Sequence, residues 1–210
     1  MPDLTVVVSG TGTEIGKTWL TVELALALRK RGLRVAIRKP VQSFDSGERT
    51  TDADLLAEAS GEDPLVVCPG HRRYPLAMAP PMAADALGGP PLELDELVEE
   101  LDLPEAGIAL IEGVGGPRSP LAHDGDTVDL ARAVDADHIA LVAHAGLGTI
   151  NSVLTSTSAF DGLDPIVFFN RFDHADTLHV ANQRWLSGVE GIDVVTDTTE
   201  LISRLNLEDR

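Results

Sequence analysis

Nine consecutive residues near the amino terminus combine the residue types that bind phosphate. They read Gly10-Thr11-Gly12-Thr13-Glu14-Ile15-Gly16-Lys17-Thr18. Glycines allow the backbone to curl so that its N–H groups point at phosphate oxygens, a lysine reaches the terminal phosphates, and a threonine hydroxyl can ligate Mg²⁺. The spacing departs from the usual P-loop pattern, because five residues instead of four separate Gly10 from Gly16. We predict that this segment binds a nucleotide phosphate.

Acidic residues at two later places could complete a Mg²⁺ site. Glu112 follows an apolar run and is itself followed by Gly113. In an open α/β sheet, ligands bind at the carboxyl ends of the strands, where this glutamate would lie. Asp52 and Asp54 begin a helical stretch, where at least one of them is expected to cap the helix. The pattern therefore predicts a carboxylate pair beside the phosphates and leaves open which aspartate takes part.

Lysine is rare in this chain, which favours arginine for its positive charges. The three lysines are Lys17, Lys30 and Lys39. A compact ammonium fits where a planar guanidinium does not, so a retained lysine can indicate a site. Lys30 stands at the expected end of a helix, where positive charge is common. Lys39 follows a strand and would lie on the side of the phosphate-binding turn, so we expect it in the site, with a solvated strand end as the alternative.

The elements that must position these residues alternate between strand and helix. Apolar, β-branched runs predict strands at 4–9, 34–38, 108–111, 138–143 and 166–169, with a weaker one at 193–196. Helical stretches are expected at 18–31, 52–60, 93–102, 127–136, 149–160 and 175–187. Such alternation is typical of a mostly parallel sheet with helices on both faces. We predict an α/β fold, with residues 1–210 forming a single P-loop NTPase-like, ATP-binding domain.

Three further expectations concern individual residues. Pro80 and Pro81 are predicted to mark a loop. Arg72 and Arg73 are expected to be solvated, although they could bind a substrate carboxylate. Trp19 and Trp185 fall in helical stretches and are expected to be packing residues. These assignments rest on residue type alone.

Composition narrows the partners and the compartment. The formal net charge of −18 argues against nucleic acid and anionic membranes as partners, because both require a broad basic face. No apolar run is long enough to span a bilayer. A single cysteine, Cys68, cannot form an internal disulfide, which favours the cytoplasm.

The motifs together resemble those of the dethiobiotin synthetase family. In order along the chain they are GTGTEIGKT, KPVQS from Lys39 to Ser43, TDADLLAEASG, YPLAMAPPMAA, IEGVGG, GLGTINS and the VFFN that ends at Asn170. They extend from residue 4 to about residue 170 and keep the order of that family. The combination of this loop, KPV and EGxGG is specific, whereas each motif alone is not.

The resemblance implies an ATP- and Mg²⁺-dependent cyclo-ligase of biotin biosynthesis. Its amine substrate would be 7,8-diaminononanoate, and CO₂ would supply the carbon that closes the ring. The neutral 7-amine takes up CO₂ as a carbamate, whose oxygen attacks the γ-phosphate to give a carbamic–phosphoric anhydride. The 8-amine then displaces phosphate. The resemblance also implies a homodimer with the amine site near its interface, and segment 146–160 is our candidate contributor.

The family roles transfer position by position to matching residues of this chain. The catalytic lysines would be Lys17 and Lys39, and the Mg²⁺ ligands Thr18, Asp52 and Glu112, with Asp54 as the alternative to Asp52. The ATP contacts would be Gly12, Thr13, Glu14, Ile15, Gly16, Lys17, Thr18 and, at the nucleobase, Asn170. The substrate contacts would be Ser43, Gly148, Thr149, Ile150 and Asn151.

Two departures keep alternative functions open. Phe44 stands where the family usually has a small glycine, and Pro81 stands where many members have histidine. They favour, as the first alternative, a related P-loop ATPase that acts on a different amine. A nucleotide-binding regulatory module is the second alternative, and intact Lys39 and Glu112 count against it.

Overall fold

Six parallel strands form the main sheet of the computed structural model, which describes residues 2–206. Their order across the sheet is β2-β5-β1-β6-β7-β8, and every neighbouring pair is parallel. The strands are β1 Leu4–Gly10, β2 Val35–Arg38, β5 Ile108–Glu112, β6 His138–His144, β7 Ile166–Asn170 and β8 Val194–Val195. A small parallel pair joins β3 Gln42–Ser43 to β4 Arg73–Tyr74.

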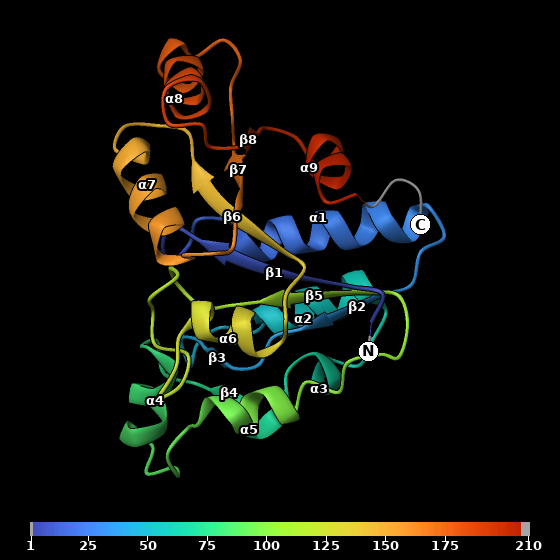
Figure 1. The fold of residues 1–210 in the computed structure, drawn as a ribbon. Coiled ribbons are helices and arrows are strands. Elements are labelled where there is room, and N and C mark those ends of the chain that lie inside the picture. The colour runs from blue at the N-terminus through green and yellow to red at the C-terminus, as the bar shows by residue number, and fades with distance from the viewer. Residues whose placement is uncertain (1, 207–210) are drawn as a thin grey trace.

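Helices cover both faces of this sheet (Figure 1). One face carries α1 Lys17–Lys30, α2 Asp52–Ser60, α3 Pro64–Val67 and α9 Thr198–Arg204. The other face carries α5 Leu94–Glu99, α6 Thr127–Ala133, α7 Thr149–Ala159 and α8 Thr177–Gly188. The predicted α/β class, with a parallel sheet between two helical layers, is therefore confirmed.

The central strand β1 shows why the sequence is apolar at every position there. Val6 and Val8 pack into the core beneath α1, whereas Val7 packs into the core on the opposite face. Each of these valines is fully buried. Side chains of a strand alternate between the two faces, so a strand covered on both sides must be apolar throughout. Burial of one valine contributes roughly 1.5–3 kcal/mol.

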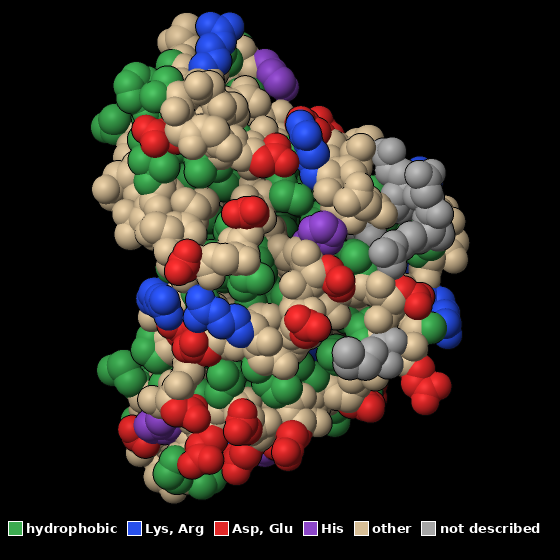
Figure 2. Space-filling model, in the orientation of Figure 1, with side chains coloured by type: hydrophobic (Ala, Val, Ile, Leu, Met, Phe, Trp, Pro, Cys, Tyr) green, Lys and Arg blue, Asp and Glu red, His purple; other side chains and the backbone are tan. Residues whose placement is uncertain are grey.

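The parallel arrangement brings the ends of distant segments to one edge of the sheet. Strand β1 lies between β5 on one side and β6 on the other, so the chain changes sides here. The turn after β1 therefore opens into a crevice, which lies between the segment that follows β5 and the segment that follows β6. Figure 2 shows the molecule hollowed on this side, between the regions of α7 and α4 (Pro80–Ala86) that Figure 1 labels.

Several element boundaries and short elements differ from the sequence-based expectation. Strand β8 has two residues where four were expected, and α5 and α6 are shorter than their predicted ranges. The expectation that Pro80 and Pro81 mark a loop was wrong, because they begin helix α4. Proline is favoured in a first helical turn, since its missing N–H has no intrahelical partner there. Helices α3, α4 and α9, the 3₁₀ turn η1 Gly70–Arg72 and strands β3 and β4 were not predicted.

One expectation about a single side chain was also wrong, and another holds only in part. Arg72 is buried, and its guanidinium bonds Glu96 and Glu100 near α5 at 2.8–2.9 Å. Those hydrogen bonds hold the pKa of the Arg72 guanidinium above its ordinary value. Trp19 and Trp185 lie in helices as expected, but they are 48% and 49% exposed, so they are only partly packed.

The surface reflects the acidic excess of the sequence. Figure 2 shows acidic side chains gathered over the region of α5, whose sequence is rich in aspartate and glutamate. Within residues 2–206, no helix has both the length and the apolar character that crossing a membrane requires.

Candidate functional site

The turn between β1 and α1 forms an open loop of backbone amides. Gly16 has φ +102°, a left-handed conformation that favours glycine, and Glu14 also has a positive φ of 57°. Helix α1 has no side-chain cap and no acidic residue in its first turn. Its first N–H groups therefore remain available to an anion, and the helix dipole adds positive potential. This is the geometry that the sequence predicts for a phosphate-binding loop.

Lys17, at the start of α1, lies along this loop. Its Nζ donates to the carbonyl oxygen of Gly12 at 3.0 Å. Burial lowers the pKa of the Lys17 ammonium to about 8, and the nearby charge of Lys39 adds to that effect. An ammonium with this pKa gains more from an added phosphate than an exposed lysine does, because the phosphate relieves an unfavourable environment.

Lys39 directly follows β2 and lies between two carboxylates. Its Nζ is 2.8 Å from Asp52 Oδ2 and 2.5 Å from Glu112 Oε1. The side chain of Lys39 is 3% exposed and that of Glu112 is fully buried. Burial disfavours the charge of Lys39, but the two carboxylates outweigh it and hold the Lys39 pKa above its ordinary value. Lys39 is thus a charged, buried group, and the alternative of a solvated strand end is wrong.

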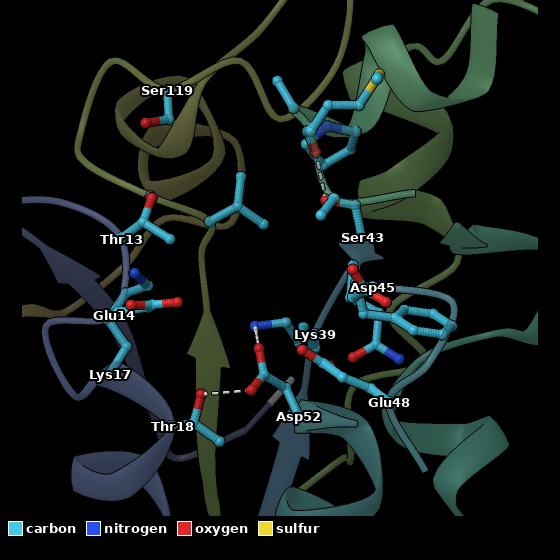
Figure 3. Close-up of a pocket in the computed structure, with 18 of the residues that line it drawn as sticks. Thr13, Glu14, Lys17, Thr18, Lys39, Ser43, Asp45, Glu48, Asp52 and Ser119 are labelled. Carbon is cyan, nitrogen blue, oxygen red and sulfur yellow. Dashed lines mark hydrogen bonds and ion pairs between the residues drawn. The ribbon is translucent and has the colours of Figure 1, made fainter. Parts of the chain in front are cut away.

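The two candidate aspartates face different neighbours. Asp54 Oδ2 accepts hydrogen bonds from the backbone N–H and the hydroxyl of Thr51 at 2.8 and 2.9 Å, which closes the first turn of α2. Asp52 points instead to Thr18 and Lys39 (Figure 3). Burial raises the pKa of Asp52, but the charge and hydrogen bond of Lys39, with help from Thr18, lower it overall. Asp52 is therefore the aspartate beside the phosphate loop, whereas Asp54 completes the capping box with the N-cap residue Thr51.

Three oxygen-bearing side chains meet at the start of α1. The hydroxyl of Thr18 is 3.0 Å from Asp52 Oδ1 and 2.9 Å from Glu112 Oε1. One hydroxyl hydrogen can serve only one of these acceptors at a time. The second oxygen of Glu112, Oε2, is buried without a hydrogen-bond partner among the described residues. Such a set of hard oxygen donors fits Mg²⁺, which keeps water or phosphate oxygens as its other ligands.

A cleft of about 600 Å³ opens in front of this group. Its near wall is the phosphate loop, with Thr13, Glu14, Lys17 and Thr18 on one side in Figure 3. Its far wall combines one hydroxyl with acidic and apolar side chains, and it consists of Ser43, Phe44, Asp45, Glu48, Ala77, Met78, Ala79 and Pro80. The Ser43 hydroxyl donates to the Met78 carbonyl oxygen at 2.5 Å. The cleft can hold a polyphosphate on one side and a second, partly apolar molecule on the other.

The structure does not bring every predicted site residue to this cleft. Gly148, the N-cap of α7, and the first helical residues Thr149, Ile150 and Asn151 do not line it. The buried hydroxyl of Thr149 has no hydrogen-bond partner within the described chain. Asn170 also lies outside the cleft lining, and its Nδ2 donates to the Ile15 carbonyl oxygen at 3.0 Å. Asn170 therefore supports the phosphate loop, and its contact with a nucleobase stays a prediction.

Sequence reasoning missed residues that hold the site in place. The Gln42 side chain is buried, donates to the Thr51 hydroxyl at 3.1 Å and accepts from the Ala53 backbone N–H at 3.0 Å. It thereby joins the segment after Lys39 to the helix that carries Asp52. Asp45, Glu48 and Ser119 line the cleft without having been singled out. The one sequence signal for Gln42 was its polar side chain within the KPVQS segment. That signal does not indicate which residues Gln42 contacts.

Comparisons with known proteins identify the relatives of this chain. Residues 4–168 match the model of a family described as AAA domain. An ATP-dependent dethiobiotin synthetase BioD of Rhodococcus jostii is 41% identical over 148 residues, which cover 69% of this chain and 62% of that protein. The match thus spans less than two thirds of that relative. One of Haloferax mediterranei is 35% identical over 200 residues, covering 90% of this chain and 81% of that protein.

A solved structure supports the fold alone. The signal recognition particle receptor FtsY from Elizabethkingia anophelis aligns with a TM-score of 0.54 at 14% identity. The alignment covers 96% of this chain and 65% of that chain.

Proposed function

The chain belongs to the dethiobiotin synthetase family, and on that premise we propose that it is an ATP- and Mg²⁺-dependent cyclo-ligase. Its substrates in this proposal are 7,8-diaminononanoate, CO₂ and ATP, and its product is dethiobiotin. The observation that carries the proposal is the buried ammonium of Lys39, held between Asp52 and Glu112 beside the phosphate loop. A cation at this place would stabilise two anions that must approach each other during phosphoryl transfer.

The phosphate half of the reaction falls to the loop between β1 and α1. The backbone of residues 12–16 and the start of α1 would bind the β- and γ-phosphates, with Lys17 neutralising their charge. Phosphoryl transfer demands little covalent chemistry from a protein, so holding the donor and acceptor in line is the main task. Asn170 would keep the loop in shape through its bond to Ile15.

Mg²⁺ would be held by Thr18, Asp52 and Glu112. The unpartnered Oε2 of Glu112 and the crowding of the Thr18 hydroxyl support this assignment. When bound, Mg²⁺ would neutralise charge on the phosphates. In the described chain no group of three His, Cys, Asp or Glu side chains gathers as a metal cluster, so phosphate oxygens and water would supply the other ligands.

The second half of the reaction requires an uncharged amine and a carbamate close to the γ-phosphate. Lys39 would neutralise the carbamate and hold its oxygen toward the phosphorus, which is a positioning and electrostatic role. Ser43, on the far wall, would orient the amines. The apolar groups of Phe44, Met78 and Pro80 would exclude water from the reactive anhydride.

Completion of the amine site by a second copy of the chain is part of the proposal. The turn of residues 148–151 does not line the cleft of its own chain, although the resemblance assigns it to the substrate carboxylate. A homodimer in which this turn reaches the cleft of the other copy would reconcile the position of the turn with the role that the resemblance assigns to it. Twofold dimers are also the commonest oligomers. The unpartnered hydroxyl of Thr149 supports a ligand at this turn.

The proposal also extends to the chain as a unit. Residues 1–210 would act as one ATP-binding domain in the cytoplasm, on small molecules rather than on nucleic acid or membranes. The family of biosynthetic enzymes and the net charge of −18 support this part.

A different amine substrate is the second candidate. Phe44 and the carboxylates of Asp45 and Glu48 line the far wall, so its shape and charge depart from a small, neutral pocket. Under this alternative, the same ATP chemistry would act on another amine. The third possibility, a regulatory module, predicts nucleotide binding without phosphate release.

A phosphate-release assay separates these candidates. The purified chain is supplied with diaminononanoate, bicarbonate and Mg²⁺, and with ATP, CTP or GTP in turn. The ligase requires both amine and bicarbonate for release, and mass spectrometry should detect dethiobiotin. Lys39→Ala should abolish release while nucleotide affinity is largely kept, and Lys30→Ala, at an exposed helix end, is the matched control. Release with another amine, but none with diaminononanoate, would favour the second candidate.

A further inference from the structure

The geometry of the site determines the direction in which a bound nucleotide must run. Lys39, Asp52 and Glu112 gather on the β2–β5 side of the phosphate loop and mark the place of the terminal phosphate. The rest of the nucleotide must then leave the loop on the opposite side, toward the carboxyl ends of β6, β7 and β8. This reasoning rests on the proposed function, which places a nucleoside triphosphate in the loop.

An exposed aromatic ring lies on that side. Trp19 immediately follows Thr18 in the first turn of α1. Its ring packs against that of Phe168 in β7, with 6.1 Å between centroids and 37° between planes. Phe168 is buried, and it stands two residues before Asn170, which bonds the phosphate loop at Ile15. Trp19 therefore links the phosphate-binding helix to the strand beside which the nucleoside would leave.

This large ring is half open to solvent directly beside the phosphate-binding residues. Trp19 is 48% exposed, although Leu20 and Leu24 of the same helix are fully buried. An indole ring offers a flat, rigid surface, and nucleobases stack on such surfaces whatever their hydrogen-bonding edges. Trp19 directly follows the phosphate-binding residues. The occupant that fits its ring is therefore the base of a nucleotide whose phosphates are bound in the loop.

We propose that Trp19 is the stacking platform for the nucleobase of the bound nucleoside triphosphate. The assignment follows from its half-open ring, its contact with Phe168 and its place on the side of the loop away from Lys39. The strength of stacking depends on the area of the base and not on its hydrogen-bonding groups. The chain should therefore accept several nucleoside triphosphates, with purines bound more tightly than pyrimidines.

Fluorescence provides a direct test, because the sequence contains only two tryptophans. Trp185→Phe leaves Trp19 as the sole indole, and Trp185 lies on α8, away from the loop. Mg²⁺–ATP should quench the emission of this variant. Mg²⁺–tripolyphosphate, which carries no base, should bind without quenching, with saturation by each ligand measured by calorimetry. In Trp19→Phe, where Trp185 remains, ATP should leave the emission unchanged.

Affinity measurements provide the second readout. Trp19→Ala should weaken ATP binding by roughly 5- to 150-fold, the range that loss of one stacked base produces. The affinity for tripolyphosphate should stay the same, which shows that the loop is intact. Trp19→Phe keeps an aromatic face and should retain most of the ATP affinity. If the alanine variant does not fold, the quenching measured in Trp185→Phe with ATP and with tripolyphosphate still decides the assignment.

Three outcomes would overturn the assignment. They are equal quenching by tripolyphosphate and ATP, an ATP affinity that is the same in Trp19→Ala and wild type, and a change of Trp19 emission with protein concentration alone. The last would show that a second copy of the chain covers the ring. Each of these leaves the proposed ATP-dependent ligase intact. Failure of the wild-type chain to bind ATP at all would instead contradict the proposed function.

Discussion

Replacing Lys39 with methionine tests whether its ammonium is the counterion of the carboxylate pair. Methionine keeps an unbranched side chain of similar length and removes the charge. Glu112 is fully buried, and Lys39 is 2.5 Å from it. The variant would leave that carboxylate buried beside Asp52 without its cation, a change that costs much more than removal of a solvated pair.

The magnitude follows from the burial of the pair. Removing one partner of a buried ion pair destabilises a protein by about 3–5 kcal/mol. For a chain of this size, each kcal/mol shifts the midpoint of thermal unfolding by about 2–4 °C. The midpoint of Lys39→Met should therefore fall by roughly 6–20 °C. Asp52 is about half exposed, so solvent screens its share and Glu112 accounts for most of the loss.

Thermal and urea unfolding in EDTA, then with Mg²⁺ added, measure this effect. Mg²⁺ should restore part of the stability of Lys39→Met, because a cation can occupy the place that the ammonium leaves. The wild-type chain should respond less. Lys30→Met is the matched control, since Lys30 is exposed at the end of α1 and its loss should change stability by about 0.5 kcal/mol or less.

Equal stability of Lys39→Met and Lys30→Met would refute the reasoning. It would mean that Glu112 is neutral or solvated and that Lys39 does not compensate its charge. A Mg²⁺ response of the same size in the wild-type chain and Lys39→Met would show that the ammonium does not compete with the metal.

Three other predictions concern the loop and the start of α2. Burial lowers the Lys17 pKa to about 8, so ATP binding at higher pH must first protonate that amine. The ATP affinity measured by calorimetry should therefore be constant below pH 8 and fall by about tenfold per pH unit above it. Gly16→Ala should lower unfolding stability by roughly 1–3 kcal/mol and impair nucleotide binding, because the residue has φ +102° and a Cβ would lie 2.0 Å from Asn170 Nδ2. Asp54→Asn should cost about 1 kcal/mol in urea unfolding and keep turnover, whereas Asp52→Asn should lose phosphate release.

Matched variants decide whether each result has the stated cause. Lys17→Arg stays charged at every pH tested, so the pH dependence of its ATP affinity should vanish, and persistence of the slope would implicate another group. Gly12→Ala places a Cβ in open space and should leave unfolding unchanged. If it destabilises as much as Gly16→Ala, steric contact with Asn170 is not the reason. Similar turnover in Asp52→Asn and Asp54→Asn would contradict their different roles.

Most of the phosphate half of the site could be predicted from the sequence. The loop from Gly10 to Thr18 joins a strand to the next helix, so strand, turn and helix are contiguous and their geometry is local. The apolar run of β1 and the parallel sheet followed from the same residues, since a strand buried on both faces tolerates little else. The motif order also indicated the family.

The far wall of the cleft could not be predicted in the same way, because it is formed by contacts between distant segments. Ser43 meets Met78, and Gln42 meets the start of α2, through loops whose lengths and residues do not specify where they pack. Arg72 looked solvated by type, but the fold brings Glu96 and Glu100 to it. Such pairings arise from the assembly of the whole chain, and a local pattern contains no information about them.

The two aspartates at the start of α2 show most clearly where prediction from the sequence stops. The sequence by itself determined that a carboxylate would stand there, because both residues begin a helix after a polar loop. Only the tertiary structure decided that Asp52 faces Thr18 and Lys39 while Asp54 completes the capping box of the helix. Two positions along a helix turn the side chain by about 200°, so the packing of α2 against α1 selects which carboxylate reaches the site.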